Sequence, residues 1–230
     1  MHQRSGTIRI VLLAGLALAG AMLAASIPAE RDIRRMNGPV LAPDSTVDGL
    51  SLGQWSARHW QWTLSFPLGR NPGQDPTGTS CGLNQDEAVF FIPRNFPPCQ
   101  VPAGTVLFVP LVGTECSNRE SGEYFGATEA DLRACAAREV DRYTGLVVRL
   151  DGEQIEAIEA YRTTSPLFSV NLPGANVLGI PPGNALFVAD GFQLIIPPLM
   201  PGPHELRVHV ELVDGTVLPD KVLHLIVVNF

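Results

Sequence analysis

Histidines suited by type to acid–base catalysis or zinc binding occur at His59, His204, His209 and His224. His59 and His224 fall on apolar faces, at helical and strand spacing respectively, which is typical of histidines packed in a core or an interface. No CxxC, HxxxH or HExxH spacing accompanies them. The sequence therefore predicts no metal site and no cofactor.

Carboxylates form a second group of candidates. The turn-rich segment 71–86 places Asp75 and Thr77 among oxygen-bearing side chains of the kind that bind Ca²⁺, but turn formation explains the same residues and EF-hand spacing is lacking. Glu115 and Asp190 could meet across the sandwich as an acid pair for glycoside hydrolysis, although ordinary surface carboxylates are the default interpretation. No GxSxG motif or glycine-rich phosphate loop is present. Under the hydrolase alternative, the polar candidates are His59, Asp75, Glu115, Asp190 and His204.

All three tryptophans lie in the segment 51–67, SLGQWSARHWQWTLSFP. Its spacing predicts an amphipathic helix that begins with a capping box at Ser51 and Gln54 and ends at Pro67. The apolar stripe consists of Leu52, Trp55, His59, Trp62 and Phe66. Trp60 points about 200° away from Trp62. It is therefore either packed beneath the loop that holds Cys81 or exposed as a ligand surface.

The elements that must position these side chains are mostly strands. Apolar runs of β-forming residues occupy 88–92 and 105–112, with Pro110 marking a bulge or an edge, and alternating patterns follow at 168–172 and 204–213. The segment 113–126 is predicted as a loop. Asp-Gly pairs at 151, 190 and 214 predict type I′ hairpin turns.

A second helix is predicted to begin at the N-cap Thr128 and to end near Tyr143. These patterns together predict a mostly β fold, an antiparallel two-sheet β-sandwich with one or two short packed α-helices.

The four cysteines are Cys81, Cys99, Cys116 and Cys135, and they allow three pairings. We favour Cys81 with Cys99 and Cys116 with Cys135, because each pair closes a local excursion of the chain. Disulfides are typical of exported proteins.

The N-terminus has the features of a secretory signal peptide: Arg4 and Arg9 precede an apolar run that ends in small residues typical of a cleavage site. We expect a signal peptide over 1–26, a flexible leader over 27–50 and a single β-sandwich domain over 51–230. An uncleaved membrane anchor is the alternative for the first segment. The expected location is the periplasm or the extracellular space.

A net charge of −7 and a pI near 5.2 argue against nucleic-acid binding, because phosphate contacts need a surplus of basic residues on one face. The apolar fraction of 45% supports one sizeable core.

Several motifs spread over most of the chain resemble those of a group of exported bacterial proteins of unknown function. They are WSARHWQW at 55–62, NPGQDPTGTSC at 71–81, VPAGTVLFVP at 101–110, YRTTSPLF at 161–168, ADGF at 189–192 and PLMPGPHEL at 198–206. The resemblance implies a shared architecture and export, and it transfers no activity or catalytic residue.

The leading functional expectation is an exported, non-catalytic binding or envelope-associated protein, whose partner is a small molecule or an envelope component. Its ligand-binding candidates are His59, Trp60, Asp75, Thr77, Glu115, Asp190 and His204. Two alternatives are a hydrolase that acts on envelope or extracellular polymer and a structural, self-associating envelope protein.

Overall fold

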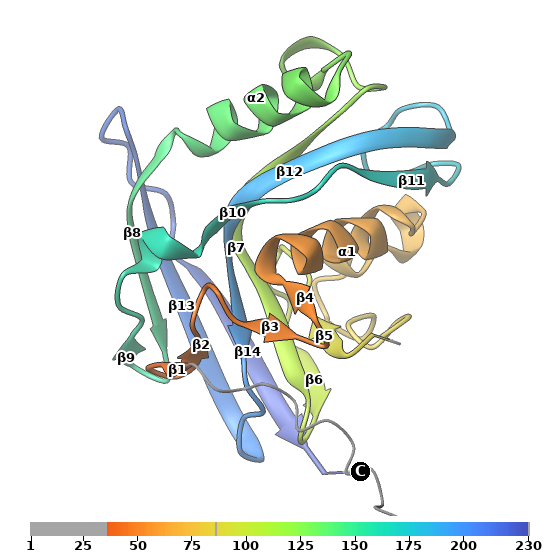
Figure 1. The fold of residues 1–230 in the computed structure, drawn as a ribbon. Coiled ribbons are helices and arrows are strands. Elements are labelled where there is room, and N and C mark those ends of the chain that lie inside the picture. Colours follow the sequence, from red (N-terminus) through yellow and green to blue (C-terminus); the bar gives the residue numbers. More distant parts are fainter. Residues whose placement is uncertain (1–35, 86, 230) are drawn as a thin grey trace, which may run out of the picture. The chain divides into compact units, whose positions relative to one another are not determined.

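Strands make up most of the secondary structure in residues 36–85 and 87–229, the part of the chain that the computed structural model describes (Figure 1). The strands are β1 (Met36–Asn37), β2 (Val40–Leu41), β3 (Thr46–Val47), β4 (Leu50–Ser51), β5 (Val89–Phe91), β6 (Cys99–Pro102), β7 (Val106–Ser117), β8 (Tyr143–Leu150), β9 (Glu153–Gln154), β10 (Arg162–Thr164), β11 (Phe168–Leu172), β12 (Gly183–Ile196), β13 (Gly202–Leu212) and β14 (Lys221–Val228). The helices are α1 (Leu52–Leu64) and α2 (Glu129–Val140), with 3₁₀ turns η1 (Leu68–Arg70), η2 (Pro72–Gln74), η3 (Gly122–Tyr124) and η4 (Ile158–Tyr161). The predicted mostly β class is confirmed.

Two five-stranded sheets carry the fold. The first has the order β10-β12-β7-β5, with β11 also paired to β12, and the second has the order β6-β14-β13-β8-β9. One cluster of buried side chains draws on both sheets, with Phe108 and Leu194 from the first and Val208 and Leu225 from the second.

Two strand pairs depart from the antiparallel arrangement that the sequence predicts. β5 pairs with β7 in parallel, and β6 pairs with β14 in parallel. Between β5 and β7 the chain forms β6 in the other sheet, so no hairpin joins β5 to β7. A parallel pair needs such a crossover.

The longest strands, β7 and β12, pair along most of their length, with Gly113 opposite Gly191. Both strands bend (Figure 1). A Cβ at Gly113 would lie 2.5 Å from the carbonyl oxygen of Asp190, so a larger residue would separate the strands. The predicted turn at Asp190-Gly191 and the predicted start of a loop at Gly113 are therefore wrong. Both strands run through these positions, because the glycines provide close approach rather than a reversal.

A bulge follows the bend. The register shifts between Phe192 and Gln193, whose partners are Val112 and Pro110, so that Leu111 is the extra residue. Of the two alternatives that Pro110 suggested, a bulge or an edge, the structure shows the bulge.

The helices cover opposite faces of the first sheet (Figure 1). On one face, Trp60 of α1 shares a buried cluster with Phe187 and Ala189 of β12. On the other face, Cys135 of α2 packs with Val188 of the same strand. The alternation of side chains along a strand therefore decides which helix each residue meets.

Both helices begin where the sequence predicts. Ser51 and Gln54 form the capping box of α1, and Thr128 and Asp131 form that of α2. All five residues of the predicted stripe on α1 are buried.

The chain between residues 36 and 50, predicted to be part of a flexible leader, instead packs against the domain. Val40 and Leu41 are buried in the main core, the Trp55 indole donates to the carbonyl of Val47 at 3.0 Å, and the Tyr161 hydroxyl donates to that of Leu41 at 3.0 Å. Apolar burial outweighs the turn-rich composition that suggested mobility. The predicted signal peptide lies outside the described residues.

Of the other two Asp-Gly pairs, Asp151-Gly152 forms the predicted turn between β8 and β9, and both residues have positive φ. At Asp214-Gly215 the chain also turns, but only Gly215 has a positive φ.

Two disulfides, Cys81–Cys99 and Cys116–Cys135, confirm the favoured pairing. Among the described residues, no helix combines the length and apolar character that crossing a bilayer requires.

Candidate functional site

The first element of the candidate site is the second face of α1. Trp60, Thr63 and Leu64 follow each other at helical spacing and lie on a different side from the stripe that enters the main core. Trp60 and Leu64 pack on the first sheet, and the edge of this contact borders a cavity of about 290 Å³.

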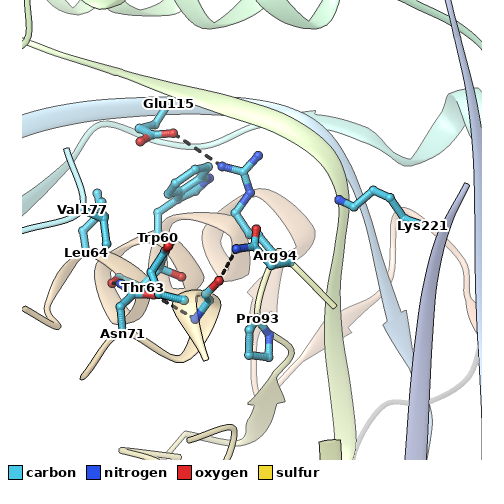
Figure 2. A pocket seen from close by; sticks show the side chains of 12 residues that line it. Trp60, Thr63, Leu64, Asn71, Pro93, Arg94, Glu115, Val177 and Lys221 are labelled. Atoms are coloured by element: carbon cyan, nitrogen blue, oxygen red, sulfur yellow. Dashed lines mark hydrogen bonds and ion pairs between the residues drawn. The ribbon is translucent and has the colours of Figure 1, made fainter. Parts of the chain in front are cut away.

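We call this cavity the Trp60 pocket (Figure 2). Its polar lining residues are Thr63, Asn71, Arg94, Glu115 and Lys221, together with Gln74 and Asn95 at exposed positions. They come from α1, η2, the segment after β5, the far half of β7 and the start of β14.

Arg94 occupies the centre of this lining. Its guanidinium carbon lies 4.2 Å from the centre of the Trp60 ring, a cation–π contact. One guanidinium nitrogen donates to the carbonyl of Gly113, and another lies 3.8 Å from a carboxylate oxygen of Glu115. Burial lowers the pKa of Arg94, but arginine is protonated at any ordinary pH.

Glu115 is the only carboxylate among the residues that line the Trp60 pocket, and it is buried. Its carboxylate forms an ion pair with Arg94. Burial raises the pKa of Glu115 to about 7, although the attraction of Arg94 acts in the opposite direction. The carboxyl group therefore titrates near neutral pH.

Lys221 brings a second cation to the pocket. Its ammonium donates to the carbonyl of Leu111 at 3.0 Å and lies 4.7 Å from the centre of the Phe96 ring. No described carboxylate forms an ion pair with it. Burial, with a smaller contribution from Arg94, lowers the pKa of Lys221 to about 8.

The Trp60 pocket thus holds two basic side chains against one carboxyl group. The Thr63 hydroxyl oxygen is buried and has no hydrogen-bond partner among the described residues. Asn71 is already engaged, because it donates to the Thr63 carbonyl at 2.8 Å and accepts from the Gly73 amide at 2.9 Å. Such a cavity has the charge and the donors to bind a small anion.

Of the candidates predicted from the sequence, Trp60 and Glu115 meet in the Trp60 pocket. His59 does not, although it is the next residue to Trp60. Its ring is buried, contacts Phe108 at 5.2 Å between ring centres and bonds through Nε2 to the carbonyl of Ile92 at 3.0 Å. Burial lowers the pKa of His59 to about 3, so it is a neutral core residue.

Asp75 and Thr77 stabilise their own loop. The Asp75 carboxylate accepts hydrogen bonds from the backbone amides of Thr77 and Ser80 and from the hydroxyl groups of Thr77 and Thr79. These bonds hold the pKa of Asp75 well below its usual range. Its oxygens are therefore used for turn formation.

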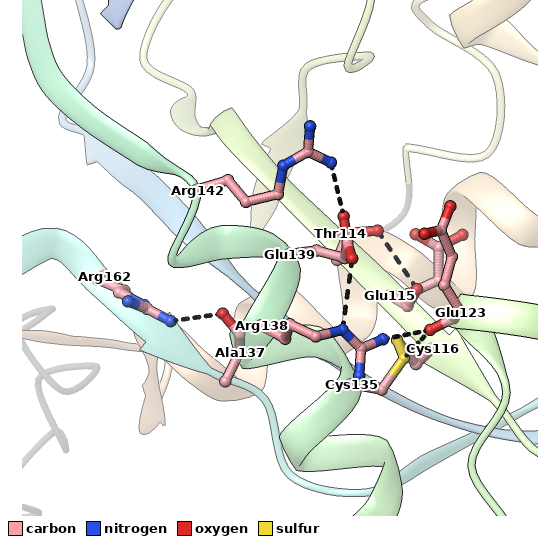
Figure 3. A network of polar contacts seen from close by, with 10 residues as sticks. All are labelled: Thr114, Glu115, Cys116, Glu123, Cys135, Ala137, Arg138, Glu139, Arg142 and Arg162. Atoms are coloured by element: carbon pink, nitrogen blue, oxygen red, sulfur yellow. Dashed lines mark hydrogen bonds and ion pairs between the residues drawn. A yellow bond between two sulfur atoms is a disulfide. The ribbon is translucent and has the colours of Figure 1, made fainter. Parts of the chain in front are cut away.

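Asp190 lies on the other face of the first sheet from Glu115, because the register pairs Glu115 with Ala189. Its carboxylate bonds to Arg162 at 2.8 Å and to Thr164 at 2.5 Å. Arg162 also donates a hydrogen bond to the carbonyl of Ala137 in α2, on the side of the sheet that holds the Cys116–Cys135 disulfide (Figure 3). The predicted acid pair of Glu115 and Asp190 is wrong for this reason.

His204 bonds to Asp151 at 2.6 Å and to the carbonyl of Met200 at 2.8 Å, on β13 of the second sheet. It does not line the Trp60 pocket. Among the described residues, no three His, Cys, Asp or Glu side chains form a group that could hold a metal ion.

Arg94 and Lys221 are functional candidates that no sequence motif marks. One signal was present: Lys221 is the only lysine among the 16 basic residues of the chain. Arg94 carried a weaker signal, as a charge within the otherwise apolar and proline-rich stretch FIPRNFPP.

A second cavity, of about 480 Å³, lies beside the Cys81–Cys99 disulfide and is bordered by His224 and the exposed Ile226. Its lining carries no charged carboxylate, lysine or arginine.

No protein-family model matches the chain, and no curated protein or solved structure is significantly similar to it. Function must therefore be inferred from the chemistry of the Trp60 pocket.

Proposed function

We propose that the protein is an exported binding protein that holds a small anionic ligand in the Trp60 pocket. The observation that carries this proposal is the charge of the lining: Arg94 and Lys221 face one cavity, Glu115 is the only carboxyl group there, and Lys221 has no carboxylate partner among the described residues. A cation in a partly buried site without a counter-ion gains free energy from a bound carboxylate or similar oxyanion.

The walls support a ligand with some apolar character. Trp60 offers an aromatic surface, and Leu64 and Val177 add aliphatic contacts. A few polar groups in an otherwise apolar concavity are the usual composition of a small-molecule site.

Export is supported by the signal-peptide pattern at the N-terminus, by two disulfides and by the resemblance to exported bacterial proteins. A periplasmic or secreted location fits these features. The two sheets that share one core favour a β-sandwich architecture, with the Trp60 pocket beside the bend of β7.

A hydrolase is the second candidate, because a carboxyl group with a pKa near 7 can act as a general acid. The pocket favours binding over this alternative. Glycoside hydrolysis by acid and base needs a second carboxylate, and the lining provides none besides Glu115.

The test is isothermal titration calorimetry of the mature protein with acetate, succinate, sulfate and inorganic phosphate at constant ionic strength. We expect at least one of these anions to bind, and Lys221→Met to weaken its binding by about tenfold or more, because a charge-assisted hydrogen bond contributes about 1.5–3 kcal/mol. Arg70→Met is the matched control, since Arg70 is exposed on η1 and does not line the pocket.

Two results would contradict the proposal: no anion binds above the effect of ionic strength, or Lys221→Met binds as well as the wild type. Sedimentation velocity would test the structural alternative, which requires self-association that increases with protein concentration.

A further inference from the structure

The Trp60 pocket contains a lysine where an arginine would serve anion binding better. All other basic residues of the chain are arginines, and arginine presents a permanently charged, bidentate donor set to carboxylates. Lysine differs from arginine in one chemical property that matters here: it can lose a proton and become a nucleophile. The only lysine of the chain lines its candidate ligand cavity.

The position of the Lys221 amine fits that property. The hydrogen bond to the carbonyl of Leu111 holds the nitrogen in place, 4.7 Å from the centre of the Phe96 ring. A neutral amine that donates one N–H to Leu111 keeps its lone pair for a second partner. Figure 2 shows the amine extending from β14 toward Arg94, into the lining of the Trp60 pocket.

Burial, and after it the charge of Arg94, favours the neutral amine of Lys221. Arg94, from the segment after β5, opposes a second positive charge, and Glu115, from β7, is already paired with Arg94. The neighbouring Asp220 bonds to His209, on the outer side of the second sheet. Burial and Arg94 together lower the pKa of Lys221 to about 8, so a useful fraction of the amine is unprotonated just above neutral pH.

We propose that Lys221 binds its ligand covalently, by forming an imine with the carbonyl carbon of a 2-oxo acid whose carboxylate lies against Arg94. This inference deepens the proposed function and rests on it. A 2-oxo acid joins the two groups that the pocket can recognise, since its carboxylate suits a guanidinium and its adjacent carbonyl suits an amine.

The step is balanced without an oxidant or a reductant. The lone pair of Lys221 attacks the carbonyl carbon, a C–N bond forms, and the electron pair of the C=O π bond moves to oxygen. A proton passes from nitrogen to that oxygen and gives a carbinolamine. A proton from solvent passes to the leaving hydroxyl group. Water leaves, C=N forms, and the remaining proton on nitrogen passes to solvent.

The test uses pyruvate as the probe and sodium cyanoborohydride to reduce the imine, with intact-mass and peptide-mass readouts. Because the chain has one lysine, the α-amino group is the only other primary amine that can react. We expect one reduced adduct on the peptide that contains Lys221, and a labelling rate that rises with pH through about 8.

The matched control is Arg70→Lys, which adds an exposed lysine to the same chain. We expect Lys221 to label at least about tenfold faster than this introduced lysine at pH 7.5, because an ordinary lysine with a pKa near 10.4 is almost entirely protonated there. Lys221→Arg should give no adduct in the pocket while keeping non-covalent pyruvate binding, which also shows that the variant is folded.

The outcomes separate the inference from the proposed function. Calorimetric binding of pyruvate without an adduct, or equal labelling of Lys221 and the introduced lysine, would overturn the imine while leaving anion binding intact. Acetone has no carboxylate. If acetone labels Lys221 as fast as pyruvate does, the assignment of a 2-oxo acid as the ligand is wrong. The ratio of Lys221 labelling to labelling of the lysine introduced by Arg70→Lys decides the case even if Lys221→Arg does not fold: a ratio that does not fall as the pH rises above about 8 contradicts the inference.

Discussion

At the residue scale, the protonation of Glu115 in the Trp60 pocket makes the stability of the protein depend on pH. Burial raises its pKa from 4.5 to about 7. A group whose pKa is higher in the folded state contributes stability that is fully present below the unfolded pKa and is lost as the pH rises through the folded pKa. We therefore expect the free energy of unfolding of the wild type, relative to Glu115→Gln, to fall by up to about 3 kcal/mol between pH 4.5 and pH 7. Urea denaturation at several pH values measures this difference.

Glu153→Gln, at an exposed position of β9, is the control and should show no such change. The comparison with a variant is needed because His59 acts in the opposite direction. Its pKa falls to about 3, so the stability that it contributes is lost as the pH falls below about 6.5. If the free energies of unfolding of the wild type and Glu115→Gln differ by the same amount at every pH, the pKa of Glu115 is not raised and its carboxyl group is solvated.

At the element scale, the Trp60 pocket lies beside the bend in β7 and β12. Gly113 accepts a hydrogen bond from Arg94 through its carbonyl, and Glu115 follows two residues later on the same face of the strand. A Cβ on Gly113 would meet the backbone of Asp190 at 2.5 Å, and a Cβ on Gly191 would meet the backbone of Val112 at 2.6 Å. The close approach of the two strands therefore depends on two residues without side chains.

We expect Gly113→Ala and Gly191→Ala each to lower the free energy of unfolding by about 1–3 kcal/mol, because backbone atoms must move to accept the new methyl group. Chemical denaturation checks the size of the effect. Gly69→Ala is the matched control, since a methyl group added there would have no atom within 4 Å and the φ of Gly69 is ordinary for an alanine. Equal stability of Gly113→Ala and Gly69→Ala would disprove the close approach.

At the scale of the whole molecule, two disulfides connect segments that the sheets alone do not hold together. Cys81–Cys99 ties the loop after η2 to β6, and Cys116–Cys135 ties β7 to α2. Each bond closes a loop of similar length, with sequence separations of 18 and 19. Their entropic stabilisation should therefore be similar.

Replacing either pair by alanines should lower the free energy of unfolding by about 3 kcal/mol, because the unfolded chain regains the entropy that the closed loop removes. Thermal or urea denaturation measures the loss, and wild-type protein under reducing conditions should be destabilised by both losses together. An unchanged transition midpoint on reduction would argue against a stabilising role in an oxidising compartment.

Local features of the chain were predictable because local chemistry decides them. The capping residues Ser51 and Thr128 set the starts of both helices, and β11 shows the predicted alternation of buried and exposed residues. The pairing of the cysteines also followed from short separations along the chain. The Asp190-Gly191 pair shows the limit of such rules, since the same dipeptide that turns the chain at Asp151 lies within a strand at Asp190.

The sequence alone determined the mostly β class, the two helices and the cysteine pairs, since each depends on neighbours within about twenty residues. Only the tertiary structure brought Trp60, Arg94, Glu115 and Lys221 to one cavity. These residues come from a helix, a connecting segment and strands of both sheets, and more than 150 positions separate the first from the last. No local pattern encodes their meeting, because it results from how the sheets pair, bend and pack.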